Sequence, residues 1–252
     1  MKLHRTLLAL AASALFAAPA FASGGATIFN VTDSEDFAVT LGFVDAFGFV
    51  DISSKSAAVA DQYQQTIFNT SLGDGDHAAD LNGDALRNAQ GNIGVNVGAG
   101  VGNTQSNDAA LSSVDAGKVF ATAMATSSQT SLLNAGYSAD FDTFYSAVLN
   151  GNALRNARGN IGVNVAAGVG NAQGNAMTGS VNTSGRYAIA TSASDQSSLG
   201  NVLEAVYDLD TFAVLGGNAL QGAQGNIGVN VAAGVGNLQH NGLSIASAVD
   251  GP

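Results

Sequence analysis

The sequence predicts an all-β protein: a β-solenoid-like stack of three layers that becomes cross-β when it polymerises. Two observations carry this prediction, a motif that occurs three times and an alternation of side chains within that motif. The motif covers residues 91–103, 159–171 and 225–237, and its last two copies are identical. The copies begin 68 and 66 residues apart, a period of about 67 residues, and a fixed period of this size indicates a repeat architecture.

The N-terminal 22 residues have the features of a signal peptide. Lys2 and Arg5 precede a short apolar stretch, and an Ala-Phe-Ala cleavage site follows at 20–22. Residues 23–55 form a separate, more aromatic segment, which we expect either to cap the stack or to bind a partner during export. Three repeats then follow, at 56–120, 121–186 and 187–252.

The segments between the motif copies also resemble one another. Residues 123–127 are similar to 188–192, and residues 140–144 are similar to 208–212. The whole repeat unit, and not only the motif, is therefore expected to recur in each layer.

In each motif copy an apolar side chain recurs at every second residue. In the second copy Ile161, Val163 and Val165 alternate with Gly162 and Asn164. Strict alternation with β-branched residues predicts a strand with one buried face. A helix is disfavoured because each glycine in a helix interior costs about 1 kcal/mol.

One motif copy cannot fold alone, because burying its few Ile and Val side chains stabilises less than ordering its backbone costs. Stacking the copies in register lets each layer cover the next, and it forms columns of identical residues. The predicted assembly core consists of three apolar columns and two amide ladders: Ile93, Ile161, Ile227; Val95, Val163, Val229; Val97, Val165, Val231; Asn96, Asn164, Asn230; and Gln105, Gln173, Gln239.

Acidic residues are distributed as such stacking requires. None occurs in residues 85–107, 153–175 or 219–241. In-register stacking would place identical carboxylates on top of one another, and like charges directly opposite are destabilising. We therefore interpret the motif as the surface through which the layers stack.

Charge and composition exclude several classes of partner. After loss of residues 1–22, six basic residues remain against 19 acidic ones, a formal charge of −13. Nucleic acids and anionic membranes are therefore not expected partners. No stretch after the signal approaches the ~20 apolar residues of a spanning helix. The chain contains no cysteine, so disulfides cannot stabilise it.

The only residues that suggest a chemical role are three repeated Asp-x-Asp pairs: Asp74 and Asp76, Asp140 and Asp142, and Asp208 and Asp210. Their carboxylates could bind Ca²⁺, act as a pH-sensitive electrostatic brake, or serve only as solubilising spacers near turns. We favour the spacer and brake hypotheses over calcium binding, because the spacing of ligands in an EF-hand loop is absent. His77 and His240 are isolated, and no serine lies in a nucleophile context. The sequence thus predicts no enzyme, no cofactor and no metal site.

The repeat resembles that of the Fap-type functional amyloid subunits. The resemblance rests on Leu-x-x-Ala-x-Gly-Asn-Ile-Gly-Val-Asn-Val followed by Asn-x-Gln-x-Asn, three times, behind a signal peptide. It implies export to the periplasm, passage through an outer-membrane pore, and polymerisation outside the cell. It also implies a second fibre subunit and one stacked β layer per repeat.

Two departures from the family pattern leave open which subunit this is, the major or the nucleating one. Family repeats usually have Gln where this chain has Thr104, Ala172 and Leu238, and the major subunit tends to carry a C-terminal Cys-x-x-Cys.

The sequence and the resemblance together predict a structural subunit of an extracellular functional amyloid fibre. Such a fibre would support the biofilm matrix and cell aggregation. The alternative is a monomeric β-solenoid adhesin at the cell surface. We expect the fibre because no polar cap follows Asn241, and an uncapped solenoid end is an open edge that templates another molecule.

Overall fold

The computed structural model describes residues 27–29, 32–36, 54–72, 76–115, 119–139, 142–185 and 187–249. Within these ranges the protein is all-β, with 17 strands and no helix. The predicted signal peptide and most of the 23–55 segment lie outside the described residues.

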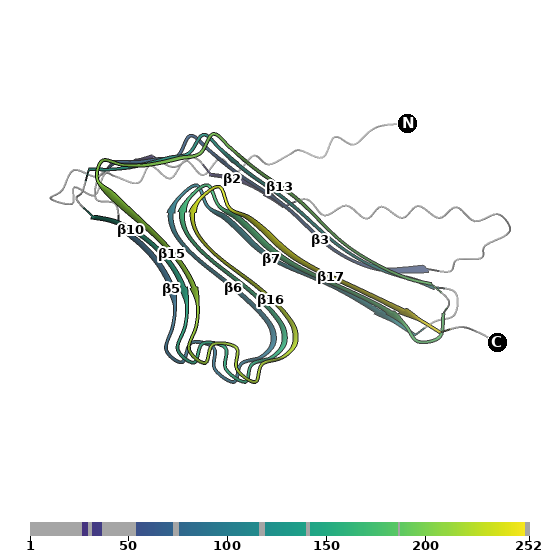
Figure 1. Ribbon diagram of the computed structural model, residues 1–252. Helices are drawn as coiled ribbons and strands as arrows, with labels where there is room; N and C mark the ends of the chain where they lie inside the picture. The colour runs from purple at the N-terminus through teal and green to yellow at the C-terminus, as the bar shows by residue number, and fades with distance from the viewer. Residues whose placement is uncertain are drawn as a thin grey trace, which may run out of the picture.

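The strands form three stacked layers, as the repeat predicted, and each layer contains five consecutive strands (Figure 1). Layer 1 consists of β3 (Ser54–Ile67), β4 (Thr70–Leu72), β5 (His77–Leu81), β6 (Gln90–Val101) and β7 (Thr104–Val114). Layer 2 consists of β8 (Val119–Leu132), β9 (Ala135–Ser138), β10 (Asp142–Leu149), β11 (Arg158–Val169) and β12 (Ala172–Asn182). Layer 3 consists of β13 (Ala188–Leu199), β14 (Val202–Ala205), β15 (Asp208–Leu215), β16 (Gln224–Val235) and β17 (Leu238–Ala248).

Equivalent strands of the three layers pair in parallel and build five sheets that run along the stack. The motif strands β6, β11 and β16 form one of these sheets, in which Ile161 pairs with Ile93 on one side and with Ile227 on the other. All twelve positions of β11 are paired in this way in both directions. The repeat spacing thus sets the register, because identical residues stack on identical residues.

The segments between the motifs stack in a different register from the one their similarity suggests. Ala190 pairs with Ala123, whereas the sequence match placed Ala188 there. Asp208 pairs with Asp142, whereas the match placed Asp210 there. Both shifts are two residues long, so they keep every side chain on its own face of the sheet.

Within a layer the chain folds back on itself, so that sheets face each other (Figure 1). The sheet of β10 packs on one face of the motif sheet, and their buried side chains form the apolar core, which includes Tyr145, Leu149, Leu154, Ile161 and Val163. The sheet of β12 packs on the other face of the motif sheet and, on its far side, against β8.

The prediction of one buried face per motif strand is wrong for the middle layer. In β11 both Val163 and Asn164 are fully buried, although they point to opposite faces. The reason is that β11 lies between two sheets. Its polar face tolerates burial because buried amides that hydrogen-bond to one another carry little desolvation penalty.

Two short strands outside the repeats lie against layer 1. β1 (Thr27–Phe29) pairs with β4 and β2 (Thr32–Asp36) pairs with β3, and both pairings are antiparallel. They are the only antiparallel pairings among the described strands. No helix in the described part of the chain is long and apolar enough to cross a membrane.

Candidate assembly surface

The apolar columns of the predicted core are formed and run through all three layers. In layer 2, Ile161 is 1% exposed and Val163 is fully buried. At the end of the same column in layer 3, Ile227 is 37% exposed. Ile161 has a layer on each side, whereas Ile227 in layer 3 lacks one of these neighbours within the described structure; Ile93, at the layer 1 end of the column, is 8% exposed.

The two predicted amide ladders are also formed. Asn164 Nδ2 donates to Asn96 Oδ1 at 2.8 Å, and Asn230 Nδ2 donates to Asn164 Oδ1 at 2.9 Å. Gln173, which is fully buried, accepts from Gln105 Nε2 at 2.9 Å and donates to Gln239 Oε1 at 2.8 Å. The structure therefore brings the predicted residues together, and their role in assembly stays a prediction.

Two further ladders escaped the sequence analysis because they lie outside the motif. Gln129 Nε2 donates to Gln64 Oε1 at 2.8 Å and Gln196 Nε2 donates to Gln129 Oε1 at 2.7 Å. Asn134 similarly links to the residues one period away on either side, Asn69 and Asn201, at 2.8 Å each. Their only signal in the sequence is an amide that recurs after 65 and then 67 residues.

The ladders give the stack a direction. In the column of Asn92, Asn160 and Asn226, each amide donates toward layer 1, at 2.7 and 2.8 Å. In the column of Gln105, Gln173 and Gln239 each amide donates toward layer 3. A second copy stacked by simple translation would continue both directions, whereas a copy turned head to head would place donors on donors and acceptors on acceptors.

Two columns of glycine allow the layers to approach closely where the backbone has positive φ. Gly159 and Gly168 both have φ of +122°. A Cβ on Gly159 would lie 2.1 Å from the carbonyl oxygen of Gly91, and a Cβ on Gly168 would lie 1.9 Å from that of Gly234. Any side chain at these two positions would therefore separate the layers.

The family of the chain follows from a comparison with family models, which matches residues 57–248 to the functional amyloid protein FapB/FapC family. The match covers all three layers. The chain belongs to this family. No curated protein and no solved structure matches the chain. The FapB/FapC family consists of structural amyloid proteins and is not an enzyme family.

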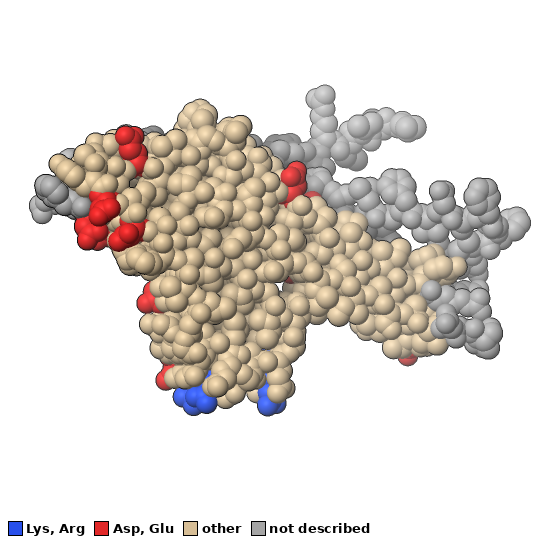
Figure 2. All heavy atoms as spheres, viewed as in Figure 1, with Lys and Arg blue, Asp and Glu red and all other residues tan. Residues whose placement is uncertain are grey.

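In this FapB/FapC family member, the open side of layer 3 is broad and carries few charges. Exposed large apolar residues cluster on layer 3, among them Ile189, Leu209, Phe212, Val214 and Ile245. Figure 2 shows a broad surface that is almost free of charged side chains, with carboxylates at its margins. The basic side chains at the lower tip of the molecule belong to layers 1 and 2, because layer 3 contains no Lys or Arg. Such a surface suits contact with another layer.

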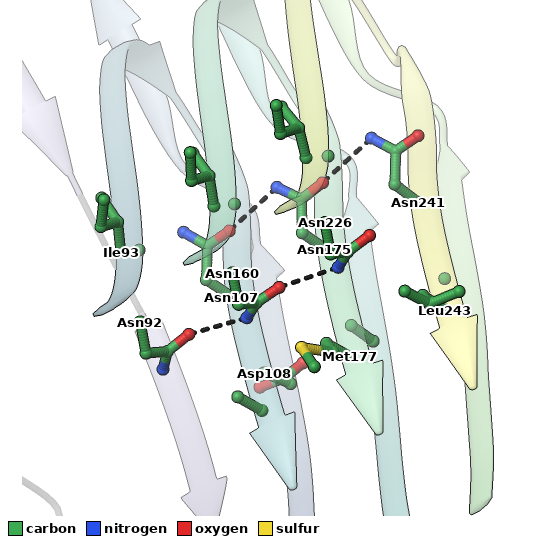
Figure 3. Close-up of a pocket in the computed structure, with 18 of the residues that line it drawn as sticks. Asn92, Ile93, Asn107, Asp108, Asn160, Asn175, Met177, Asn226, Asn241 and Leu243 are labelled. Atoms are coloured by element: carbon green, nitrogen blue, oxygen red, sulfur yellow. Dashed lines mark hydrogen bonds between the residues drawn. The ribbon is translucent and has the colours of Figure 1, made fainter. Parts of the chain in front are cut away.

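A groove of about 340 Å³ runs along the stack between the motif sheet and the sheet of β12. Two rows of asparagines line it, joined along each row by hydrogen bonds (Figure 3). Every layer contributes the same kind of side chain, so the groove is a consequence of the repeat.

The Asp-x-Asp pairs are only partly described, because Asp74 and Asp140 lie outside the described residues. Asp142 pairs with Asp208 in the stack, and Asp76 Oδ1 accepts a hydrogen bond of 2.9 Å from the backbone N–H of Phe144. No group of three or more potential ligands that could hold a metal ion is found in the described ranges. This arrangement does not support the hypothesis that the Asp-x-Asp carboxylates bind Ca²⁺.

Burial shifts the pKa values of two histidines and one tyrosine in the described part of the chain. It lowers the pKa of His77 and, in layer 3, that of His240. Burial, with a smaller contribution from Asp76, raises the pKa of Tyr145 to about 12. The rings of His77 and Tyr145 are 5.0 Å apart. These shifts follow from packing between layers, and packing is sufficient to explain them.

Proposed function

We propose that the chain is a secreted subunit that polymerises head to tail into an extracellular amyloid fibre. In this arrangement layer 3 of one copy stacks on layer 1 of the next, with Ile227 over Ile93 and Asn230 over Asn96. The observation that carries the proposal is the contrast between layers: side chains fully buried in layer 2 have exposed equivalents in layer 3. A second copy would bury them again.

Membership of the FapB/FapC family supports the wider setting of the proposal. In that setting the chain passes through the periplasm and an outer-membrane pore, joins a second fibre subunit, and supports the biofilm matrix and cell aggregation. A monomeric adhesin is not favoured, because the family is one of amyloid proteins.

The proposal predicts that purified chain lacking residues 1–22 forms thioflavin-positive fibres on its own. Their diffraction should show a meridional reflection near ~4.7 Å, because the strands stack along the fibre axis. Electron microscopy and fibre diffraction measure this directly. A protein that stays monomeric for days at concentrations of about 0.1 mM, within the range at which unpaired strand edges associate, would contradict the proposal.

Salt is expected to accelerate assembly, because copies with a formal charge of −13 repel one another. The thioflavin lag time should shorten as ionic strength rises from ~0.01 M to ~0.15 M, where the Debye length falls from about 30 to about 8 Å. The midpoint of urea unfolding of the monomer should change little. A lag time independent of salt would exclude charge as the brake.

Acid should act differently from salt in the same experiment. Protonating carboxylates near pH 4 removes the repulsion and shortens the lag. The folded-state pKa values of His77 and His240 are lowered from 6.5. The unfolded chain therefore binds protons first as the pH falls below 6.5, and the stability present above that pH is partly lost. Faster assembly with a lower urea midpoint is the expected combination.

A further inference from the structure

The two strands that precede the repeats lie on the edge that head-to-tail stacking would use. β2 pairs residues 32–36 with Gln62–Thr66 of β3, and β1 pairs residues 27–29 with Thr70–Leu72 of β4. In the sheet order, β3 lies between β8 and β2, and β4 lies between β9 and β1. β1 and β2, which we call the strap, therefore occupy the outer side of layer 1.

A second copy needs the same place. Continuing the stack by translation puts β13 of the second copy along the outer side of β3 and its β14 along β4. The strap and the second copy cannot both pair with these strands, because each backbone edge accepts one neighbour. The strap also runs antiparallel to the strands it covers, so it does not serve as a further parallel layer.

The composition of the strap fits a strand that blocks an edge. Three of the five residues of β2 are acidic: Asp33, Glu35 and Asp36. Charged residues on an edge strand are a common means by which proteins prevent sheets from joining edge to edge. The motif strands, by contrast, carry no acidic residue.

The strap is also short enough to be displaced. β2 covers five residues of β3, which is 14 residues long, whereas β13 has 12 residues to pair. Among the described strands, β5, β6 and β7 have no neighbour on the outer side of layer 1. A second copy can therefore begin to pair at these open strands and then replace the strap.

We propose that the strap is an autoinhibitory element that covers part of the docking edge for a second copy of this chain and slows head-to-tail addition. The inference rests on the proposed function. Each junction in a fibre requires that one strap leaves layer 1. In a free monomer the strap slows the addition of a second copy but does not prevent it.

A reversible covalent lock tests the inference. The double variant Asp33→Cys with Gln65→Cys joins two directly paired positions of β2 and β3, and neighbouring strands lie within the distance a disulfide spans. The chain has no other cysteine. Oxidised protein should show a thioflavin lag at least about tenfold longer than reduced protein, because only copies with a free edge are competent to add.

The matched control places a disulfide in the same column but between layers 2 and 3. Thr130 pairs with both Gln65 and Ser197, so Thr130→Cys with Ser197→Cys locks two layers that are already stacked. Its lag should be the same in both redox states. Equal lags for oxidised and reduced strap-locked protein would overturn the inference, as would failure of the disulfide to form under oxidising conditions.

A deletion provides a second measurement in the opposite direction. The chain without residues 1–36 should assemble with a lag several-fold shorter than the chain without residues 1–22. An unchanged or longer lag would overturn the inference. If wild-type and reduced proteins never form fibres, the proposed function itself fails, and this result is distinct from fibres whose kinetics ignore the strap.

Discussion

Replacing Val163 by lysine is expected to abolish fibre formation and to unfold most of the monomer. Val163 is fully buried, pairs with Val95 and Val229, and belongs to the apolar core. A lysine there has no acidic partner, because the surrounding motif contains none. An unpaired buried charge costs several kcal/mol, which is comparable with the whole stability of a domain of this size. Circular dichroism and thioflavin kinetics measure the two effects.

The control for this variant must face solvent, and the structure decides which residue does so. The sequence alone suggests Ser194, but this residue is half-buried and its hydroxyl oxygen is buried without a hydrogen-bond partner. Ser197 is exposed on the outer face of β13, so Ser197→Lys is the better control. Equal loss of fibres in both variants would show that the motif is not the core.

The identity of the motif copies explains why so much of the stack was predictable. Parallel, in-register pairing places Ile161 between Ile93 and Ile227, and the sequence repeats those three residues at nearly equal spacings of 68 and 66 residues. The number of layers, the register of the motif sheet and the Asn96 and Gln105 ladders all depend on this repetition alone. These features follow from the repeated motif itself, so they can be predicted without knowing how the chain folds within a layer.

What could not be predicted depends on how one layer folds in its own plane. No pattern in the sequence states that β10 covers one face of β11 and β12 the other, and this arrangement buries Asn164 as completely as Val163. The ladder of Gln64, Gln129 and Gln196 escaped notice for a related reason. Its flanking residues differ among the layers, so only its place inside the fold distinguishes it from a surface glutamine.

The two-residue register shifts have a similar origin. The repeats are 68 and 66 residues apart at the motif, so the spacing must change somewhere between copies. An alignment of the short similar segments between the motif copies places this change of spacing at the wrong position in the repeat. The structure pairs Ala190 with Ala123, and this register places Gln196 on Gln129, to which it donates a hydrogen bond.

The variants Gly91→Ala and Gly234→Ala are each expected to fold as monomers and to form no fibres. In a single chain a Cβ on Gly91 meets no atom within 4 Å, and one on Gly234 meets only Asn237 and Thr211, at 3.9 and 4.0 Å. In a continued stack the first would meet the carbonyl oxygen of Gly225 of one neighbour. The second would meet that of Gly100 of the other, by analogy with the distances of about 2 Å between layers inside the chain. The strain of positive φ costs each variant about 1–3 kcal/mol.

Mixing the two variants separates a head-to-tail fibre from every other arrangement. Gly91→Ala blocks only layer 1 of its own copy, and Gly234→Ala blocks only layer 3. One junction remains available in the mixture, between layer 3 of the first variant and layer 1 of the second, and both surfaces of that junction are wild type. A heterologous contact of this kind forms a dimer and then stops, because each remaining end is blocked. Analytical ultracentrifugation should therefore find monomers in each separate sample and a one-to-one dimer in the mixture, which also shows that both variants are folded. Fibres in either separate sample would mean that the layers of different copies do not stack as they do within the chain. A mixture that stays monomeric would exclude the head-to-tail junction.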